Sequence, residues 1–167
     1  MIQIRKTQPE DIDHLMNIFE QGKRIMRKSG NLKQWTGSYP SRDLIKKDIE
    51  AGHSYVCLDK KEDIIGTFTF IPGKDPTYAR IYEGQWLDDE RPYATIHRLA
   101  STEDSHGVAA ACLEWCYTQM QNLRADTHRD NLILQHILQK HGFRYCGIIY
   151  LLNGDERLAY QKIGDER

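Results

Sequence analysis

The stretch from Ile96 to Ala111 holds residue types that could bind a phosphorylated ligand. It has the pattern of a strand, a turn and a helix, and small residues fill the start of the helix, at Gly107 and from Ala109 onward. A first helical turn without bulky side chains leaves its unpaired N–H groups open, and these groups together with the helix dipole can hold a diphosphate. A small-residue helix packed tightly against a sheet would have the same composition. The spacing by itself leaves both interpretations open.

Periodicities on either side of this stretch predict the elements that would position it. Apolar residues at three- and four-residue spacing, such as Ile12, Leu15 and Phe19, predict helices. Runs of β-branched and aromatic residues bounded by turn residues predict strands, and Asn153-Gly154 predicts a terminal hairpin. The segment 72–92 is expected to be irregular, although 79–82 has the composition of a strand. We expect strands near 2–6, 54–58, 64–70, 94–100, 123–128, 143–152 and 156–163, and helices that begin near 9, 41, 108 and 131.

This order of elements predicts an α/β (α+β) fold. The expected architecture is a single mixed, mostly antiparallel sheet of about six to seven strands, flanked by about four helices. The strand–helix–strand unit at 94–128 should form a parallel crossover. Because no repeat, low-complexity segment or linker divides the chain, we expect one domain over residues 1–167.

The composition argues against several classes of protein. The chain has 167 residues, of which 40% are hydrophobic and 28% are charged. Its formal net charge of −1 does not favour binding to nucleic acid or to an anionic membrane. No apolar run approaches the roughly 20 residues of a spanning helix, and the first residues lack the apolar core of a secretory signal, so we expect a cytoplasmic protein. No metal site is expected, because the cysteines match no metal-binding spacing and should be buried free thiols. These cysteines are Cys57, Cys112, Cys116 and Cys146.

Two motifs lie at the starts of predicted helices. Leu99-Ala100-Ser101 ends a strand and is followed by the loop 104–109, and the segment 131–143 reads NLILQHILQKHGF. Both resemble signatures of the GNAT superfamily, the GCN5-related N-acetyltransferases. The first signature is Arg or Gln, two residues, Gly, one residue, then Gly or Ala, after an L-A-V-like triplet. The second is N-x-x-A-x-x-L-Y-x-K-x-G-F, and the IHRLAS and DTHRDN segments are similar to an uncharacterised bacterial branch of the family. The residues in register with the second signature are Asn131, Lys140, Gly142 and Phe143.

The resemblance implies an acetyl-CoA-dependent N-acetyltransferase. Such a protein transfers an acetyl group to a primary amine by direct attack in a ternary complex, with acetyl-CoA as co-substrate. The acceptor would be a small-molecule or peptide-like amine, with no nucleic-acid or membrane partner. The pantetheine arm would pair with the triplet at 99–101 and contact Asn131, and the diphosphate would lie at the start of the helix. The residues thus implied in cofactor binding are Leu99, Ala100, Ser101, His106, Gly107, Val108, Ala109, Ala110, Ala111 and Asn131.

His97 is the candidate catalytic base. An amine with a pKa of about 10 is mostly protonated at neutral pH, so a base must remove its proton. Strand alternation places His97 opposite Ile96 and Arg98, on the face that Thr95 and Leu99 share. The position resembles one of two histidines in the corresponding strand of arylalkylamine N-acetyltransferases, and Thr95 occupies the other. A strand amide near Leu99 could stabilise the oxyanion. The alternative is a histidine hydrogen-bonded within the sheet.

Aromatic and acidic residues outside these motifs are candidates for the acceptor pocket. Glu83 could attract a cationic amine or act as a catalytic base through water, and the alternative is a solvated loop carboxylate. Tyr82 and Trp86 lie beside it, where the family often builds its acceptor wall. Trp35 and Tyr39 could close the pocket with aromatic faces suited to a cation, or could pack onto the core.

A polar cluster follows the strand predicted at 123–128. Asp126 and His128 should share one face of that strand, so that a carboxylate could orient an imidazole. Asp130 is expected to cap the next helix.

Two departures from the family pattern leave a second class of function open. Asp104 stands where a cation or glutamine is usual, and Leu138 replaces the tyrosine that many members use as general acid. A catalytically silent acyl-CoA-binding module would tolerate both changes, whereas a nucleotide-binding α/β protein would need two more spaced glycines. The sequence does not define the acceptor, the general acid, the acyl-chain preference or the oligomeric state. The terminal hairpin offers an edge along which a homodimer could form.

Overall fold

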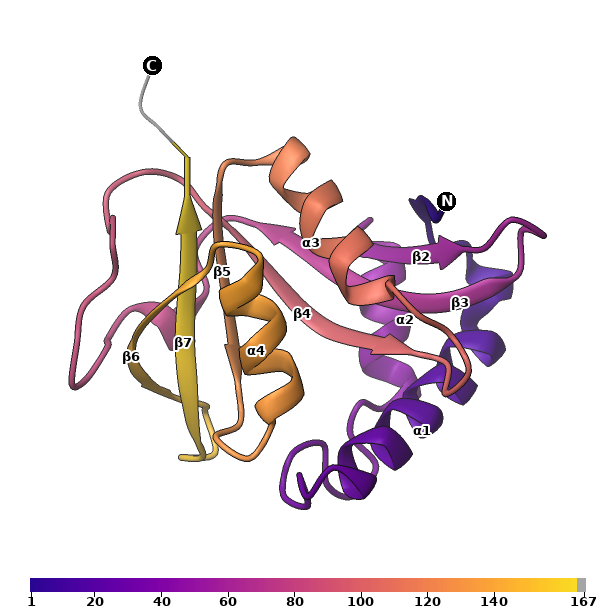
Figure 1. Ribbon diagram of the computed structural model, residues 1–167, viewed down its shortest axis with the longest axis horizontal. Helices are drawn as coiled ribbons and strands as arrows, with labels where there is room; N and C mark the ends of the chain where they lie inside the picture. Colours follow the sequence, from indigo (N-terminus) through magenta and orange to yellow (C-terminus); the bar gives the residue numbers. More distant parts are fainter. Residues whose placement is uncertain (165–167) are drawn as a thin grey trace.

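The computed structural model describes residues 1–164. It contains one seven-stranded sheet with helices on both faces (Figure 1). The strand order is β1-β2-β3-β4-β5-β7-β6. Helices α1 and α2 pack on one face, and α3 and α4 pack on the other. None of the helices in the described part of the chain is both long and apolar enough to cross a membrane. The strands are β1 (Gln3–Lys6), β2 (Ser54–Leu58), β3 (Ile64–Pro72), β4 (Ala94–Ser101), β5 (Asn122–Thr127), β6 (Arg144–Tyr150) and β7 (Glu156–Ile163), and the helices are α1 (Ile12–Lys28), α2 (Arg42–Glu50), α3 (Val108–Gln119) and α4 (Leu132–Lys140).

The order of elements confirms the prediction from the sequence. Neighbouring strands are antiparallel except β4 and β5, which are parallel, as expected for a crossover through α3. The strand composition of 79–82 was misleading, since only Tyr82 forms an isolated bridge, with Ile148. A short helical turn at Pro76–Tyr78 and the left-handed backbone of Glu83 (φ 54°) prevent extension on either side.

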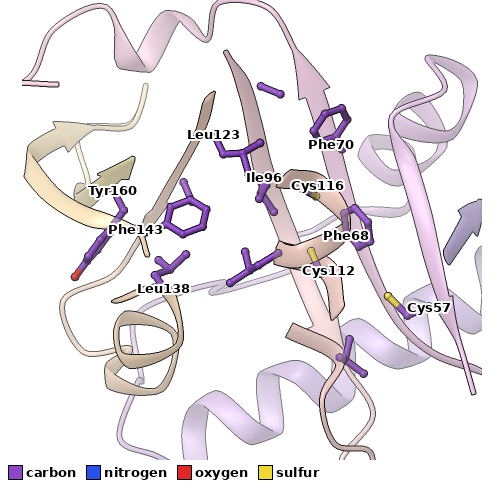
Figure 2. Close-up of a cluster of buried hydrophobic side chains, with 14 residues drawn as sticks. Cys57, Phe68, Phe70, Ile96, Cys112, Cys116, Leu123, Leu138, Phe143 and Tyr160 are labelled. Carbon is purple, nitrogen blue, oxygen red and sulfur yellow. The ribbon is translucent and has the colours of Figure 1, made fainter. Parts of the chain in front are cut away.

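The larger core lies between the sheet and helices α3 and α4. Figure 2 shows Phe68 and Phe70 of β3 close to Cys112 and Cys116 of α3. The four cysteines are free and buried, as the sequence predicts. Burial raises the pKa of the Cys57 thiol to about 12, so this group is an uncharged part of the core at neutral pH.

A second core lies under α1 and α2. Leu15 from α1 and Ile45 from α2 pack with Val56 and Ala100 of the sheet. Val56 precedes Cys57, which points into the larger core, because successive residues of a strand face opposite sides. The sheet is therefore buried on both faces at its centre, where the candidate functional residues of β4 lie.

The irregular segment 73–93 packs as a third core against β5, β7 and β6. Arg124 of β5 is only 1% exposed, and its guanidinium carbon lies 3.9 Å from the ring centroids of both Trp86 and Tyr93. It also donates a hydrogen bond to the main-chain oxygen of Asp88 at 3.0 Å. Stacking of a cation between two aromatic faces is favourable when water is excluded, so Arg124 holds this segment on the sheet.

Strands β4 and β5 meet at one end only. Their parallel pairing comprises two residue pairs, Ala94 with Leu123 and Thr95 with Arg124. Beyond these pairs the strands separate, as Figure 1 shows. Within residues 1–164, the edge of β4 that faces β5 has no strand partner from 96 to 101.

Gly84→Ala should lower the free energy of unfolding by about 2–3 kcal/mol. A Cβ atom at Gly84 would lie 1.9 Å from the main-chain oxygen of Cys146. Neither backbone can move away without disturbing the two hydrogen bonds between Tyr82 and Ile148, each 2.8 Å long. Urea unfolding measures the effect, with Gln85→Ala at the exposed neighbour as control. Equal stability of the two variants would contradict the close packing of segment 73–93 on β6.

Candidate functional site

A bulge in β4 sets the directions of the side chains at its open edge. The register with β3 shifts between the pairs Thr67–Ala100 and Thr69–His97, and Arg98 has a left-handed φ of 50°. The hydroxyl of Thr69 donates to the main-chain oxygen of His97 at 2.9 Å. The extra residue bends the strand and changes the directions in which the neighbouring side chains point.

The bulge changes the alternation that the sequence predicts. His97 and Arg98 both reach partners on the side of the sheet that α2 and segment 73–93 cover, whereas Leu99 packs with the core under α3. The expectation that His97 shares a face with Leu99, opposite Arg98, is therefore wrong. A strict two-residue period holds only where a strand has no bulge.

A cavity of about 710 Å³ lies between the diverging strands. Helices α1, α3 and α4, the loop after α1 and the turn between β6 and β7 complete its walls. Leu113, Leu134 and Ile137 give it an apolar wall, and Asp75 and His97 lie at its polar end. Its size and mixed lining are typical of small-molecule and cofactor sites.

His97 lies between two carboxylates in this cavity. Its Nε2 is 3.0 Å from Oδ2 of Asp75, and its Nδ1 is 3.9 Å from Oδ2 of Asp126. All three side chains line the cavity. The imidazole therefore has one carboxylate at hydrogen-bond distance and a second near its other nitrogen, and it is accessible from the cavity.

Asp75 is held in place by its own turn. Its Oδ1 accepts hydrogen bonds from the main-chain N–H and the hydroxyl of Thr77, at 2.9 and 2.7 Å, and its N–H donates to the hydroxyl of Tyr93 at 2.7 Å. Burial raises the pKa of Asp75, but the hydrogen bonds from His97 and Thr77 outweigh this effect and lower it to about 2. Asp75 is therefore a carboxylate at neutral pH and can orient the imidazole.

Asp126 is anchored by a buried phenol. The hydroxyl of Tyr78 donates to its Oδ2 at 2.6 Å. Burial, followed by the adjacent charge of Asp126, raises the pKa of Tyr78 well above its ordinary value, so the phenol stays protonated. Asp126 faces His97 rather than His128, contrary to the pairing considered from the sequence. The Nδ1 of His128 instead accepts a hydrogen bond from the N–H of Asp130 at 3.0 Å.

Arg98 is neutralised by a buried ion pair. Its Nε and Nη2 donate to the two carboxylate oxygens of Asp48, each at 2.8 Å, and its Nη1 donates to the hydroxyl of Tyr39 at 3.3 Å. Burial lowers the pKa of Arg98, but Asp48 and Tyr39 raise it by more. The pair ties the bulge to α2 and leaves Asp75 and Asp126 as the charges beside His97.

The loop after α1 brings Trp35 and Tyr39 to the wall of the cavity, as the sequence suggests. The ring of Trp35 packs edge-on against Phe19 with centroids 5.7 Å apart, and its centroid is 6.3 Å from that of Tyr39. Arg27 fixes the loop by donating to the main-chain oxygens of Gln34 and Trp35 at 2.8 and 3.0 Å. Trp35 therefore both packs on the core and lines the cavity.

The strand part of the implied cofactor site lines the cavity, and the helix part does so only at its start. Gly107 precedes α3 with a left-handed φ of 81°, and no side chain caps the helix. The first N–H groups of α3 therefore lack intrahelical partners. Among the implied residues, the lining includes Leu99, Ala100, Ser101, Val108, Ala109 and Asn131, and leaves out His106, Gly107, Ala110 and Ala111.

Asn131 caps α4, in place of the predicted Asp130. Its Oδ1 accepts a hydrogen bond from the N–H of Leu134 at 3.0 Å, because the helix begins one residue later than expected. Its Nδ2 donates to Oε1 of Gln34 at 3.1 Å, which links α4 to the loop after α1. Leu138 is fully buried in the cavity wall and contributes only apolar surface.

Comparison with solved structures shows the family. The crystal structure of a GNAT-family acetyltransferase from Streptococcus agalactiae 2603 is 35% identical, with a TM-score of 0.90 over 99% of this chain and 96% of that chain. The chain belongs to the GNAT family of acetyltransferases. A GNAT-family acetyltransferase from Listeria monocytogenes 4b F2365 shares the fold at 19% identity, with a TM-score of 0.69 over 96% of this chain and 94% of that one. The NatC complex bound to Gag peptide and CoA shares it at 15% identity, with a TM-score of 0.66 over 98% and 99%. No family model and no curated protein matches the chain.

Glu83, Tyr82 and Trp86 of this GNAT protein lie away from the cavity. Tyr82 bridges to β6, Glu83 next to it is exposed, and Trp86 is buried in the third core. Segment 73–93 crosses the sheet so that its first residues, not its middle, reach β4. The carboxylate beside His97 is consequently that of Asp75.

Sequence reasoning missed Asp75, Tyr78 and Asp48 in this GNAT site. Each lies far from β4 in sequence and reaches His97, Asp126 or Arg98 only through the tertiary fold. The Asp-Pro-Thr run at 75–77 is a local turn signal that could have shown a fixed carboxylate. Within residues 1–164, no group of three or more His, Cys, Asp or Glu side chains is placed to hold a metal ion.

Asp75→Asn should flatten the acid end of the stability profile. The folded-state pKa of Asp75 is about 2 against an ordinary 3.8, so the carboxylate contributes stability that is present above pH 3.8 and lost as the pH falls toward 2. The free energy of unfolding, measured with urea at neutral pH and at about pH 3, should fall less in the variant than in the wild type. Asp63→Asn, an exposed carboxylate next to β3, is the control. An acid-induced loss in Asp75→Asn as steep as in the wild type would contradict the prediction.

Proposed function

We propose that residues 1–167 form an acetyl-CoA-dependent N-acetyltransferase domain whose acceptor is a primary amine. Membership of the GNAT family supports acetyl transfer. The observation that carries the proposal is the unpaired edge of β4, which lines one cavity together with the start of α3 and with His97. A long substrate can lie along this edge while its reactive end meets a base.

The open edge of β4 suits the pantetheine arm of acetyl-CoA. Beyond Thr95 the main chain of β4 has no strand partner on its β5 side within residues 1–164, so the amides of the arm can bond to it like an added strand. Val108 and Ala109 line the cavity at the start of α3, where free N–H groups and the helix dipole favour a diphosphate. The NatC complex, which shares the fold, was solved with CoA bound. When bound, acetyl-CoA supplies the acetyl group as a reactive thioester.

His97 serves as the base in this proposal. Asp75 and Asp126 attract an ammonium group, which is the main form of a primary amine at neutral pH. Because Nε2 of His97 donates its hydrogen bond to Asp75, the nitrogen without a proton is Nδ1. Nδ1 faces Asp126 and takes the proton from the amine. The imidazolium then lies between the two carboxylates. Main-chain N–H groups on the open side of β4 near Leu99 can stabilise the oxyanion that develops during attack.

A catalytically silent acyl-CoA-binding module is the competing function. The observation in its favour is Leu138, an apolar, fully buried side chain where many family members carry a tyrosine. The proposed enzyme accordingly has no side chain assigned as general acid. CoA release in the presence of a panel of primary amines, with the acetylated product identified by mass spectrometry, separates the two functions. CoA binding without release by any amine would establish the silent module.

His97→Gln should lower kcat by about 100-fold or more while acetyl-CoA still binds. Glutamine can keep a hydrogen bond to Asp75, but it cannot exchange a proton near neutral pH. Amine-stimulated CoA release measures kcat, and calorimetry measures the affinity. The control is His53→Gln, which lies outside the cavity lining and should keep wild-type turnover. Unchanged kcat in His97→Gln would remove this residue from the mechanism.

Ala109→Glu should weaken acetyl-CoA binding by at least about tenfold without lowering the melting temperature. A carboxylate in the first turn of α3 interacts favourably with the helix dipole but repels a diphosphate. Calorimetric titration and thermal melting measure the two quantities. Thr118→Glu adds the same charge at the exposed far end of α3 and should leave the affinity unchanged. If both variants bound acetyl-CoA equally well, the diphosphate would not lie at the start of α3.

A further inference from the structure

We propose that the acceptor carries an anionic group, a carboxylate or a phosphate, in addition to its amine, and that Arg157 binds this group with Lys33 beside it. The inference rests on the proposed function, because it defines the acceptor that the same cavity takes. It predicts an amino-acid-like substrate whose two charges match the two ends of the acceptor site.

Arg157 is a buried cation on β7. It is 7% exposed, and no carboxylate within residues 1–164 forms an ion pair with it. Its guanidinium makes one hydrogen bond, from Nη1 to the main-chain oxygen of Glu156 at 2.8 Å. The other guanidinium nitrogens have no partner in the described chain, yet none of them is fully enclosed. Since Arg157 lines the cavity, these N–H groups are open to a ligand there.

Arg157 and Asp126 lie on the same face of the sheet. Asp126 of β5 pairs with Ala159 of β7, and alternation puts Arg157 on the same side as Ala159. Both charged residues line the 710 Å³ cavity. An acceptor whose amine lies beside Asp126 and His97 would therefore extend along the sheet toward Arg157.

The cations of Lys33 and Arg129 lie close enough to Arg157 to act with it on the neighbouring His128. The pKa of His128 is lowered first by burial and then by the charge of Arg157, and Lys33 and Arg129 lower it further against the opposing effect of Asp130. Lys33 lines the same cavity and, like Arg157, also lines an adjoining cavity of about 390 Å³. There is room here for an anion of the size of a phosphate.

No acidic group near Arg157 forms an ion pair with it within residues 1–164. Glu156 forms an ion pair with Arg129. The exposed Asp155 closes the turn between β6 and β7, where its Oδ2 accepts a hydrogen bond from Nδ2 of Asn153 at 3.2 Å. The carboxylate of Asp130 lies 3.7 Å from Nδ1 of His128 and is not paired with Arg157. The free donors of Arg157 thus remain for a ligand.

The phosphates of acetyl-CoA lie elsewhere in the proposed complex. The start of α3 belongs to the face of the sheet that α3 and α4 cover, and Val108 there packs in the larger core. Arg157 shares the opposite face with Asp126. Changes at Arg157 should therefore alter the use of the acceptor and leave the affinity for acetyl-CoA unchanged.

The test compares matched acceptors in steady-state assays of CoA release. Straight-chain amino acids from glycine to aminohexanoate are compared with their neutral amides, and aminoalkyl phosphates form the second arm. The wild type should favour one anionic series by about tenfold or more in kcat/KM, mainly through KM. The preferred series identifies carboxylate or phosphate. Equal or better use of the neutral amides would overturn the inference while the acetyltransferase function stands.

Variants of Arg157 connect this preference to the residue. Arg157→Gln should abolish the preference through a higher KM for the anionic acceptor, Arg157→Lys should retain part of it, and neither should change acetyl-CoA affinity. Arg144→Gln, an exposed arginine on the neighbouring β6, is the matched control. A full preference in folded Arg157→Gln would refute the assignment. If no amine is turned over, calorimetry of the same acceptors with CoA-bound protein gives the comparison by binding, and the absence of turnover counts against the proposed function alone.

Discussion

The candidate site depends on the short hydrogen-bonded pairing between strands β4 and β5. Two residue pairs hold the parallel strands together, and beyond Thr95 they separate within the middle of a sheet that is covered on both faces. Backbone groups at such a position need hydrogen-bond partners, which here must come from water or a ligand. The space between β4 and β5 can therefore bind an extended ligand that carries several hydrogen-bonding groups. The bulge at Arg98 then turns His97 toward the face of the sheet that segment 73–93 covers, where it contacts Asp75.

Some charged residues along one face of β5 and β7 stabilise the structure, and others are available to bind a ligand. Arg124 is enclosed between two aromatic rings and fixes segment 73–93. That segment carries Asp75 and Tyr78, which in turn position His97 and Asp126. A stacked arginine that does not line the cavity therefore determines the geometry of residues in the proposed acceptor site. Further along the same face, Arg157 lacks such enclosure and stays available to a ligand.

Much of the fold could be predicted from the sequence because its signals are local. Periodic apolar residues gave the helices, and β-rich runs with turn residues gave the seven strands in their order. The Leu99 triplet and the small residues after Gly107 led to the proposed cofactor side of the site, and His97 was singled out from its place in β4. These features depend on spacing within one or two neighbouring elements.

The proposed acceptor side could not be predicted in the same way, because it depends on contacts between distant segments. Glu83 and Asp75 are both acidic residues of one irregular segment, and only the path of that segment decides that Asp75 meets His97. The bulge at Arg98 was equally hidden, since the run 94–101 has an ordinary strand composition. Arg157 can be recognised as a candidate binding residue only from its burial and from the absence of an ion pair in the described chain.

A crystal structure of the protein with CoA tests the account most directly. Electron density for the pantetheine arm is expected between β4 and β5, bonded to the main chain at 99–101, with the diphosphate at the start of α3 and the sulfur directed toward His97. Density for CoA at another surface, or a complex in which this gap is closed by side chains, would contradict it.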